Sequence, residues 1–94
     1  MNSDIIIWLH DNKFGIIYLI TPLINQKKNA LQTYDVIFHD EINKQFKSLY
    51  LSLIGIEASA ALGCSAEDFY ETVEDVNVTE YLNELIQEGE NEND

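Results

Sequence analysis

The chain has 94 residues, a length that suits one domain built around a single hydrophobic core. Hydrophobic residues make up 46% of the sequence, which is too apolar for a chain that stays disordered. The net charge of -12 and the lack of any Arg argue against direct binding to DNA, RNA or an anionic membrane.

The first half of the chain predicts a small antiparallel sheet of about three strands. Residues 4–10, "DIIIWLH", and 14–20, "FGIIYLI", are rich in β-branched and aromatic side chains, and a polar turn-like cluster separates them. These two runs therefore predict a hairpin. Residues 21–30 contain the only Pro and predict a polar connection. A third strand is expected in "QTYDVIFH", residues 32–39, where apolar side chains alternate with polar ones.

The second half predicts about three helices. Behind Asp40, a residue suited to N-capping, apolar side chains recur at three- and four-residue spacing at Ile42, Phe46, Leu49, Tyr50 and Leu53. Gly63 is expected to end this helix and Ser65 to cap the second. Asn77 is expected to cap the third, which Gly89 would close. The prediction is a single α+β domain over residues 1–89, followed by a flexible acidic tail over residues 90–94.

The net charge lies entirely in the second half of the chain. Residues 1–47 hold five Lys and five acidic residues, whereas residues 48–94 hold twelve acidic residues and no basic one. On the predicted helices the carboxylates form rows three and four residues apart, opposite apolar faces. The candidate partner-binding residues are Glu67, Asp68, Glu71, Glu74, Asp75, Glu80, Glu84 and Glu88. Like charges at this spacing destabilise a helix, and a basic partner would relieve the repulsion.

This pattern predicts an interaction protein that binds a basic partner, most simply a nucleic-acid-binding protein whose groove the carboxylates enter in place of phosphates. In size and charge the chain resembles the small acidic phage-encoded inhibitors of host restriction, CRISPR and related defence systems, which act as DNA mimics. That resemblance rests on physical character and implies no particular residues. An immunity protein or antitoxin that neutralises a basic toxin would have the same charge pattern, and it remains the alternative.

The dipeptide His-Asp occurs twice, at His10-Asp11 and His39-Asp40, each time at the end of a predicted strand. If the two strands run in the same direction, both dipeptides lie at one end of the sheet, where they would suit a divalent metal or acid-base chemistry. The spacing matches no metal-ligand motif, however, and His and Asp commonly end strands. We therefore expect a structural role for them, no cofactor and no enzymatic activity.

Two further expectations concern assembly and location. Strand one carries apolar side chains on both faces, Trp8 among them, so we expect a homodimer through the near-neutral β half. The N-terminus lacks the basic region of a signal peptide, and the longest apolar runs are far shorter than the roughly 20 residues that span a bilayer. Cys64 is the only cysteine and cannot form an intrachain disulfide. These features predict a cytoplasmic protein.

Overall fold

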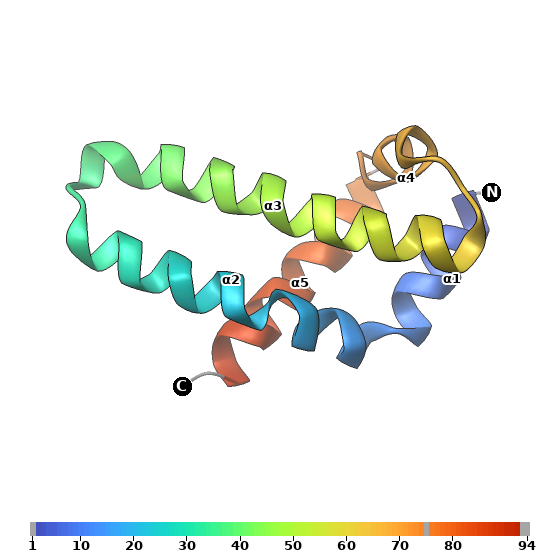
Figure 1. Cartoon of the computed structure of the whole chain (residues 1–94), viewed down its shortest axis with the longest axis horizontal. Coiled ribbons are helices and arrows are strands. Elements are labelled where there is room, and N and C mark those ends of the chain that lie inside the picture. Colours follow the sequence, from blue (N-terminus) through green and yellow to red (C-terminus); the bar gives the residue numbers. More distant parts are fainter. Residues whose placement is uncertain (1, 75, 93–94) are drawn as a thin grey trace.

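This computed structural model describes residues 2–74 and 76–92. These residues form five helices joined by short turns and contain no strand. The helices are α1 (Asn2–Asp11), α2 (Lys13–Thr33), α3 (Val36–Leu62), α4 (Ala66–Val73) and α5 (Val76–Glu92), shown in Figure 1. The fold is therefore all-α, and the expected α+β class with an N-terminal sheet is wrong.

The first predicted strand is instead part of helix α1. The prediction failed because the continuous apolar run conceals the four-residue spacing of its buried side chains. Ile5 and Leu9, four residues apart, are fully buried in the core, while Ile6 and Ile7 are exposed. Trp8 packs against the core and is half-buried. The preference of β-branched residues for strands reflects how well they fit a half-buried pleated surface, so tertiary packing can override it.

The second predicted strand and the connection after it both belong to α2. Ile16, Ile20 and Ile24 are buried at four-residue intervals on one side of this helix. Pro22 lies inside α2, where it cannot donate a hydrogen bond to the carbonyl of Tyr18. Both residues are exposed, so water can solvate that carbonyl. The helix continues past the proline because three buried isoleucines hold it on both sides of the gap.

Only two residues of the third predicted strand, Tyr34 and Asp35, have extended backbone, and they form the short turn between α2 and α3. The apolar residues that follow begin α3 and are exposed rather than alternating between two faces. His39 closes the turn, since its Nε2 lies 3.1 Å from the carbonyl oxygens of both Leu31 and Tyr34. Both partners are acceptors, so Nε2 carries the proton and donates.

Several helix boundaries agree with the sequence. Gly63 follows α3 in the left-handed conformation, with φ of 68°, and the Ser65 Oγ accepts a 3.1 Å hydrogen bond from the backbone N–H of Asp68. These two predictions are confirmed. Other boundaries differ, because α3 begins at Val36 behind Asp35 rather than behind Asp40. Helix α5 begins before Asn77 and continues through Gly89 to Glu92.

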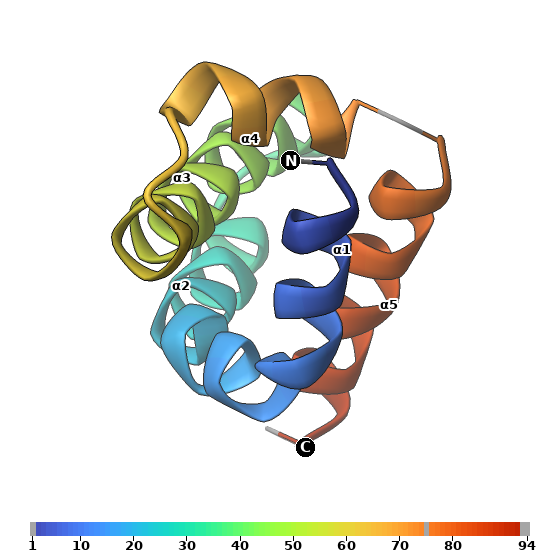
Figure 2. The same ribbon diagram turned by 90° about the vertical axis from the view of Figure 1, so that its right-hand side faces the viewer.

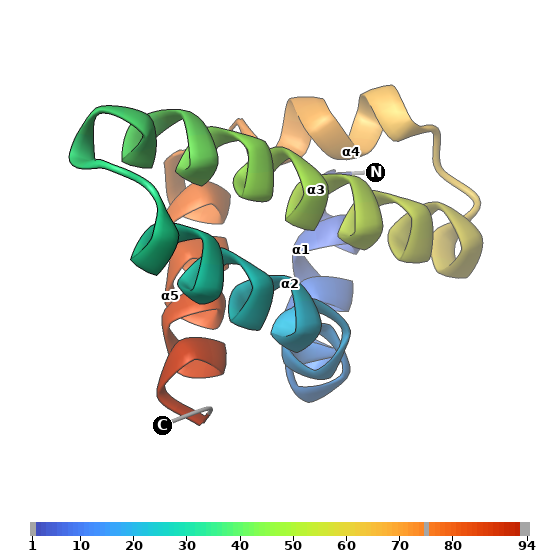
Figure 3. The same ribbon diagram turned by 60° about the vertical axis from the view of Figure 1, so that its left-hand side comes forward.

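Helices α2 and α3 form a long antiparallel hairpin, and α1, α4 and α5 pack on one side of it. Figure 2 looks along the hairpin and shows α4 lying across one side of the assembly. Helix α5 packs directly on α2, and α1 lies nearer the base of the hairpin (Figure 3). The tip of the hairpin projects past the other helices (Figures 1 and 3). The described chain measures 41 × 24 × 21 Å along its principal axes.

One core joins all five helices. Its buried members include Ile5, Leu9, Ile20, Ile24, Tyr50, Ile54, Phe69, Leu82 and Leu85. Helix α4 approaches α3 closely at Gly55, where an added Cβ would lie 3.0 Å from Cδ1 of the fully buried Phe69 ring. Helix α5 is tied to α1 by the Tyr81 hydroxyl, which donates a 2.9 Å hydrogen bond to the carbonyl of Leu9.

We predict that Gly55→Ala destabilises the protein by about 1–3 kcal/mol, because the new methyl group overpacks a rigid aromatic contact. Gly15→Ala is the matched control. Nothing lies within 4 Å of a Cβ at Gly15, and alanine favours the helix by up to about 1 kcal/mol. Urea unfolding followed by circular dichroism measures both free energies. Equal stability of the two variants would contradict the close packing of α4 on α3.

A second prediction concerns Tyr81. Burial raises the pKa of its phenol, and the nearby carboxylates of Glu88, Asp11 and Glu84 raise it further, while Lys13 opposes them. A raised pKa in the folded state favours the neutral hydroxyl, so this stabilisation is present below the ordinary tyrosine pKa of about 10. It is lost as pH rises through the folded-state pKa.

Tyr81→Phe should therefore lower the free energy of unfolding by about 1 kcal/mol at neutral pH. The cost should shrink above pH of about 10, where the wild-type hydroxyl ionises. Urea unfolding between neutral and alkaline pH checks this, with Tyr18→Phe as the control because the Tyr18 side chain is largely exposed. A cost that stays constant with pH would contradict it.

Candidate functional site

Helix α4 directs the first row of predicted carboxylates away from the core. Phe69, Thr72 and Val73 are buried on one side of α4. Glu67, Glu71 and Glu74 lie on the opposite side of the helix and are all exposed. Glu67 and Asp68 occupy the first turn of α4, where negative charge interacts favourably with the helix dipole. Asp68 is half-buried, and its backbone N–H is the group that Ser65 caps.

Helix α5 carries the second row. Val78, Leu82 and Leu85 are buried in the core, and Glu80 and Glu84 are exposed on the other side of the helix. The third member of the row, Glu88, is half-buried and forms a 3.0 Å ion pair with the Nζ of Lys13 on α2. The hydrogen bond to Glu88 raises the pKa of Lys13. Glu88 therefore contributes to the packing of α5 against α2.

The structure brings most of the predicted residues to one region but not into a single strip. Glu67, Glu71, Glu74, Glu80 and Glu84 are exposed, Asp68 and Glu88 are half-buried, and Asp75 lies outside the described residues. Helix α4 lies across one side of the molecule, and α5 runs along the adjacent side (Figure 2). The exposed carboxylates therefore form two rows on neighbouring sides, which we call the acidic surface.

Asp11 joins this region although it belongs to the charge-balanced half of the chain. Its carboxylate lies close enough to Tyr81 to raise the pKa of that phenol, as do Glu84 and Glu88. It reaches this position because the end of α1 packs beside α5, held by the hydrogen bond from Tyr81 to Leu9. Nothing in the local sequence around Asp11 signals this long-range contact.

The two His-Asp pairs do not come together. His10 lies at the end of α1 and His39 in the first turn of α3, and the 21 residues of α2, roughly 30 Å of helix, separate these positions. The idea that both pairs lie at one end of a sheet is therefore wrong, because there is no sheet in the described residues. Nor do three or more His, Cys, Asp or Glu side chains among those residues gather closely enough to hold a metal ion.

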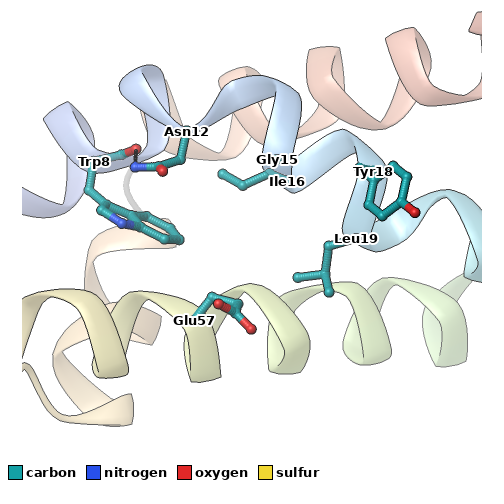
Figure 4. Close-up of a pocket in the computed structure, with 7 residues that line it drawn as sticks. All are labelled: Trp8, Asn12, Gly15, Ile16, Tyr18, Leu19 and Glu57. Carbon is teal, nitrogen blue, oxygen red and sulfur yellow. Dashed lines mark hydrogen bonds between the residues drawn. The ribbon is translucent and has the colours of Figure 1, made fainter.

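The hollows on the surface are mostly apolar, and one of about 350 Å³ between α3 and α4 has no charged residue in its lining. Figure 4 shows one of about 230 Å³ between the base of the hairpin and α1, lined by Trp8, Asn12, Gly15, Ile16, Tyr18, Leu19 and Glu57. Sites for small molecules usually measure about 300–1,000 Å³ and bring together several polar groups. Glu57 is the single charged residue among the seven that line this hollow. The acidic surface is thus the stronger candidate for a functional site.

Comparison of the chain with protein-family models, with curated proteins and with solved structures finds no match. Among the described helices, none combines the length and the apolarity that crossing a membrane requires.

We predict that salt stabilises this protein by screening repulsion within the two rows. Like charges three or four residues apart cost about 0.2–0.5 kcal/mol per pair in a helix, and each row contains such pairs. Raising NaCl from about 20 mM to about 500 mM should raise the melting temperature by roughly 5 °C. A variant with Gln at Glu67, Glu71, Glu74, Glu80 and Glu84 should gain clearly less. An equal gain in both proteins would show that the repulsion within each row is too weak to measure.

Proposed function

We propose that this chain is an acidic interaction protein that inhibits a basic nucleic-acid-binding protein by occupying its nucleic-acid-binding groove. The observation that carries the proposal is the one-sided charge of the C-terminal helices. From residue 66 to residue 92 the sequence contains ten acidic residues and no basic residue. A surface kept charged only for solubility typically mixes both signs.

The spacing of the carboxylates supports the same proposal. Side chains four residues apart on a helix are separated by about 6 Å along its axis, within a factor of two of the roughly 3.4 Å between phosphates on one nucleic-acid strand. The five exposed glutamates also lie opposite buried apolar stripes, so their carboxylates project toward solvent. A groove lined with Lys and Arg would meet charge on two neighbouring sides of one domain.

Electrostatic repulsion supplies a driving force for binding. Each row holds like charges at neighbouring positions along its helix, so the free protein carries repulsion that a basic partner relieves. Long-range attraction between the -12 chain and a basic groove would also speed association. By its resemblance in size and charge to phage-encoded inhibitors, the chain is expected to target a host restriction, CRISPR or related defence factor in the cytoplasm.

The test compares two variants of equal net charge. The first replaces Glu67, Glu71, Glu74, Glu80 and Glu84 by Gln. The second replaces Asp4, Asp35, Asp40, Glu41 and Glu57, which are also exposed, by Asn or Gln. Both variants change the net charge from -12 to -7. If the acidic surface binds the partner, the first should lose at least about tenfold in affinity, and the second should remain within about threefold of wild type.

Affinity capture from host lysates, with elution by a salt gradient, identifies the partner. The affinity of each variant for that partner then gives the contribution of the carboxylates that the variant lacks. Labelled DNA or RNA bound to the captured protein should be released when the wild-type chain is added in a gel-shift assay. A stable ternary complex of target, nucleic acid and this chain would contradict competition for one groove. Capture of a basic toxin would instead support the antitoxin alternative.

A further inference from the structure

The face of the α2–α3 hairpin that points away from the other helices is uncovered. Helices α1, α4 and α5 all lie on the opposite side of the hairpin, as the view along its axis shows (Figure 2). Tyr50, Ile54 and Ala58 of α3 are buried at four-residue spacing, and Ile42 is buried nearer the tip of the hairpin. A different set of α3 residues therefore faces outward.

Leu49 and Ile56, which lie seven residues apart, belong to that outward set. Leu49 is 47% exposed and Ile56 is 64% exposed in the described chain, and Ile56 also borders α4, where it lines a hollow with Tyr70. Ala60, four residues after Ile56, is exposed as well. Ile42 and Phe46 do not belong to this set, because Ile42 is buried and Phe46 packs against the core.

Apolar side chains extend this outward set toward both ends of the hairpin. At the tip, Tyr34, Phe38, Ile42 and Phe46 line a hollow of about 280 Å³ between α2 and α3. Near the base, Tyr18 and Leu19 of α2 line the hollow of Figure 4 beside Glu57 of α3. Phe38 is eleven residues before Leu49, which places it on the same side of α3. We call this whole surface the hairpin face.

The hairpin face is large enough to pair with another protein. At roughly 100 Å² each, its five most exposed side chains offer on the order of 500 Å², near the upper limit for the largest apolar patch of a typical monomer. These side chains are Tyr18, Tyr34, Phe38, Leu49 and Ile56. With the half-buried Leu19 and Leu53 beside them, this area is more than half of the roughly 800 Å² that each partner contributes to a standard specific interface.

The distribution of charge favours a second copy of this chain as the occupant. Residues 13–62 contain five Lys and four acidic residues, a net charge of +1, whereas the rest of the chain holds thirteen acidic residues and no basic one. Two copies that meet through their hairpins bring near-neutral surfaces together and keep the acidic surfaces apart. Contact through α4 or α5 would place strongly acidic helices against each other.

We propose that two copies pair through the hairpin face, with the two α3 helices antiparallel about a twofold axis at Leu49. The surface suits this symmetry because the exposed Phe38 and Ala60 are each eleven residues from Leu49, so each Phe38 would meet the small Ala60 of the partner subunit. The two hairpins together form a four-helix bundle, with both acidic surfaces directed outward.

This interface replaces the dimer expected from a sheet, which the helical fold excludes. Trp8, which the sheet-based dimer would have placed at the interface, packs against the core, so Trp8→Glu would damage the fold. Leu49 is the informative position because it lies on the proposed axis, where it would contact Leu49 of the partner subunit. The proposal does not depend on the identity of the target, so it is tested with the purified chain alone.

Light scattering after size exclusion, at about 50 µM, should give twice the monomer mass of 10.8 kDa for the wild type. Leu49→Glu and Leu49→Lys should each give the monomer mass, because each places two like charges together on the axis. An equimolar mixture of these two variants should recover the dimer mass through a Glu–Lys pair. Ile7→Glu is the control, since Ile7 is an exposed apolar residue of α1 away from the hairpin, and it should remain dimeric.

Circular dichroism on every variant confirms that the helices are retained. A wild-type mass of 10.8 kDa at this concentration would overturn the proposal. A dimer that persists in folded Leu49→Glu, or that Ile7→Glu disrupts equally, would place the interface elsewhere and would also overturn it. Failure of the mixture to recover the dimer would exclude the antiparallel arrangement about Leu49.

Discussion

The core of this protein lies on one side of the α2–α3 hairpin, and that constraint determines what every other surface can do. Ile20 and Ile24 of α2 and Ile54 of α3 are fully buried there beneath α1, α4 and α5. The contact of Phe69 with Gly55 fixes α4 against α3, and the hydrogen bond from Tyr81 to Leu9 fixes α5 beside α1. Because the remaining helices all pack on this side, the other side of the hairpin stays open.

The same arrangement separates the charges of the chain. All five lysines lie on α2 and α3, whereas ten of the seventeen acidic residues belong to the segment from residue 66 to residue 92 that contains α4 and α5. Lys13 links the two groups through its ion pair with Glu88, at the base of the hairpin. One domain therefore has two surfaces of different physical character. The acidic surface suits a basic partner through long-range attraction, and the hairpin face suits a partner that buries apolar side chains.

The sequence predicted the second half of the chain better than the first, for a physical reason. In α4, acidic and apolar residues alternate with the helical period, and the capping Ser65 and the terminal Gly63 mark boundaries by local chemistry. In α1 and α2, nearly continuous β-branched runs fit a strand as well as a buried helix, and only packing decides between them. Pro22 led to the wrong prediction of a connection over residues 21–30, because an exposed proline can be tolerated inside a helix that is held by its buried face.

The candidate site was predictable only in part. The exposure of Glu67, Glu71 and Glu84 follows from their spacing opposite buried residues, so the sequence was sufficient to locate them. The ion pair of Glu88 with Lys13 and the position of Asp11 beside α5 depend on contacts between distant parts of the chain. Among the apolar residues whose spacing predicted a helix in α3, Ile42 and Tyr50 are buried and Phe46 packs against the core, whereas Leu49 is exposed.

The most direct test of this account is a map of amide chemical shifts as an oligo-arginine peptide is added to the labelled protein. We predict that the shifts concentrate in residues 66–88 and largely disappear in about 0.5 M NaCl, since screened charges no longer attract the peptide. The amides of residues 36–62 on the hairpin should change little. Shifts spread evenly over the chain, or concentrated on the hairpin, would contradict the claim that one side of this domain is built to bind a basic partner.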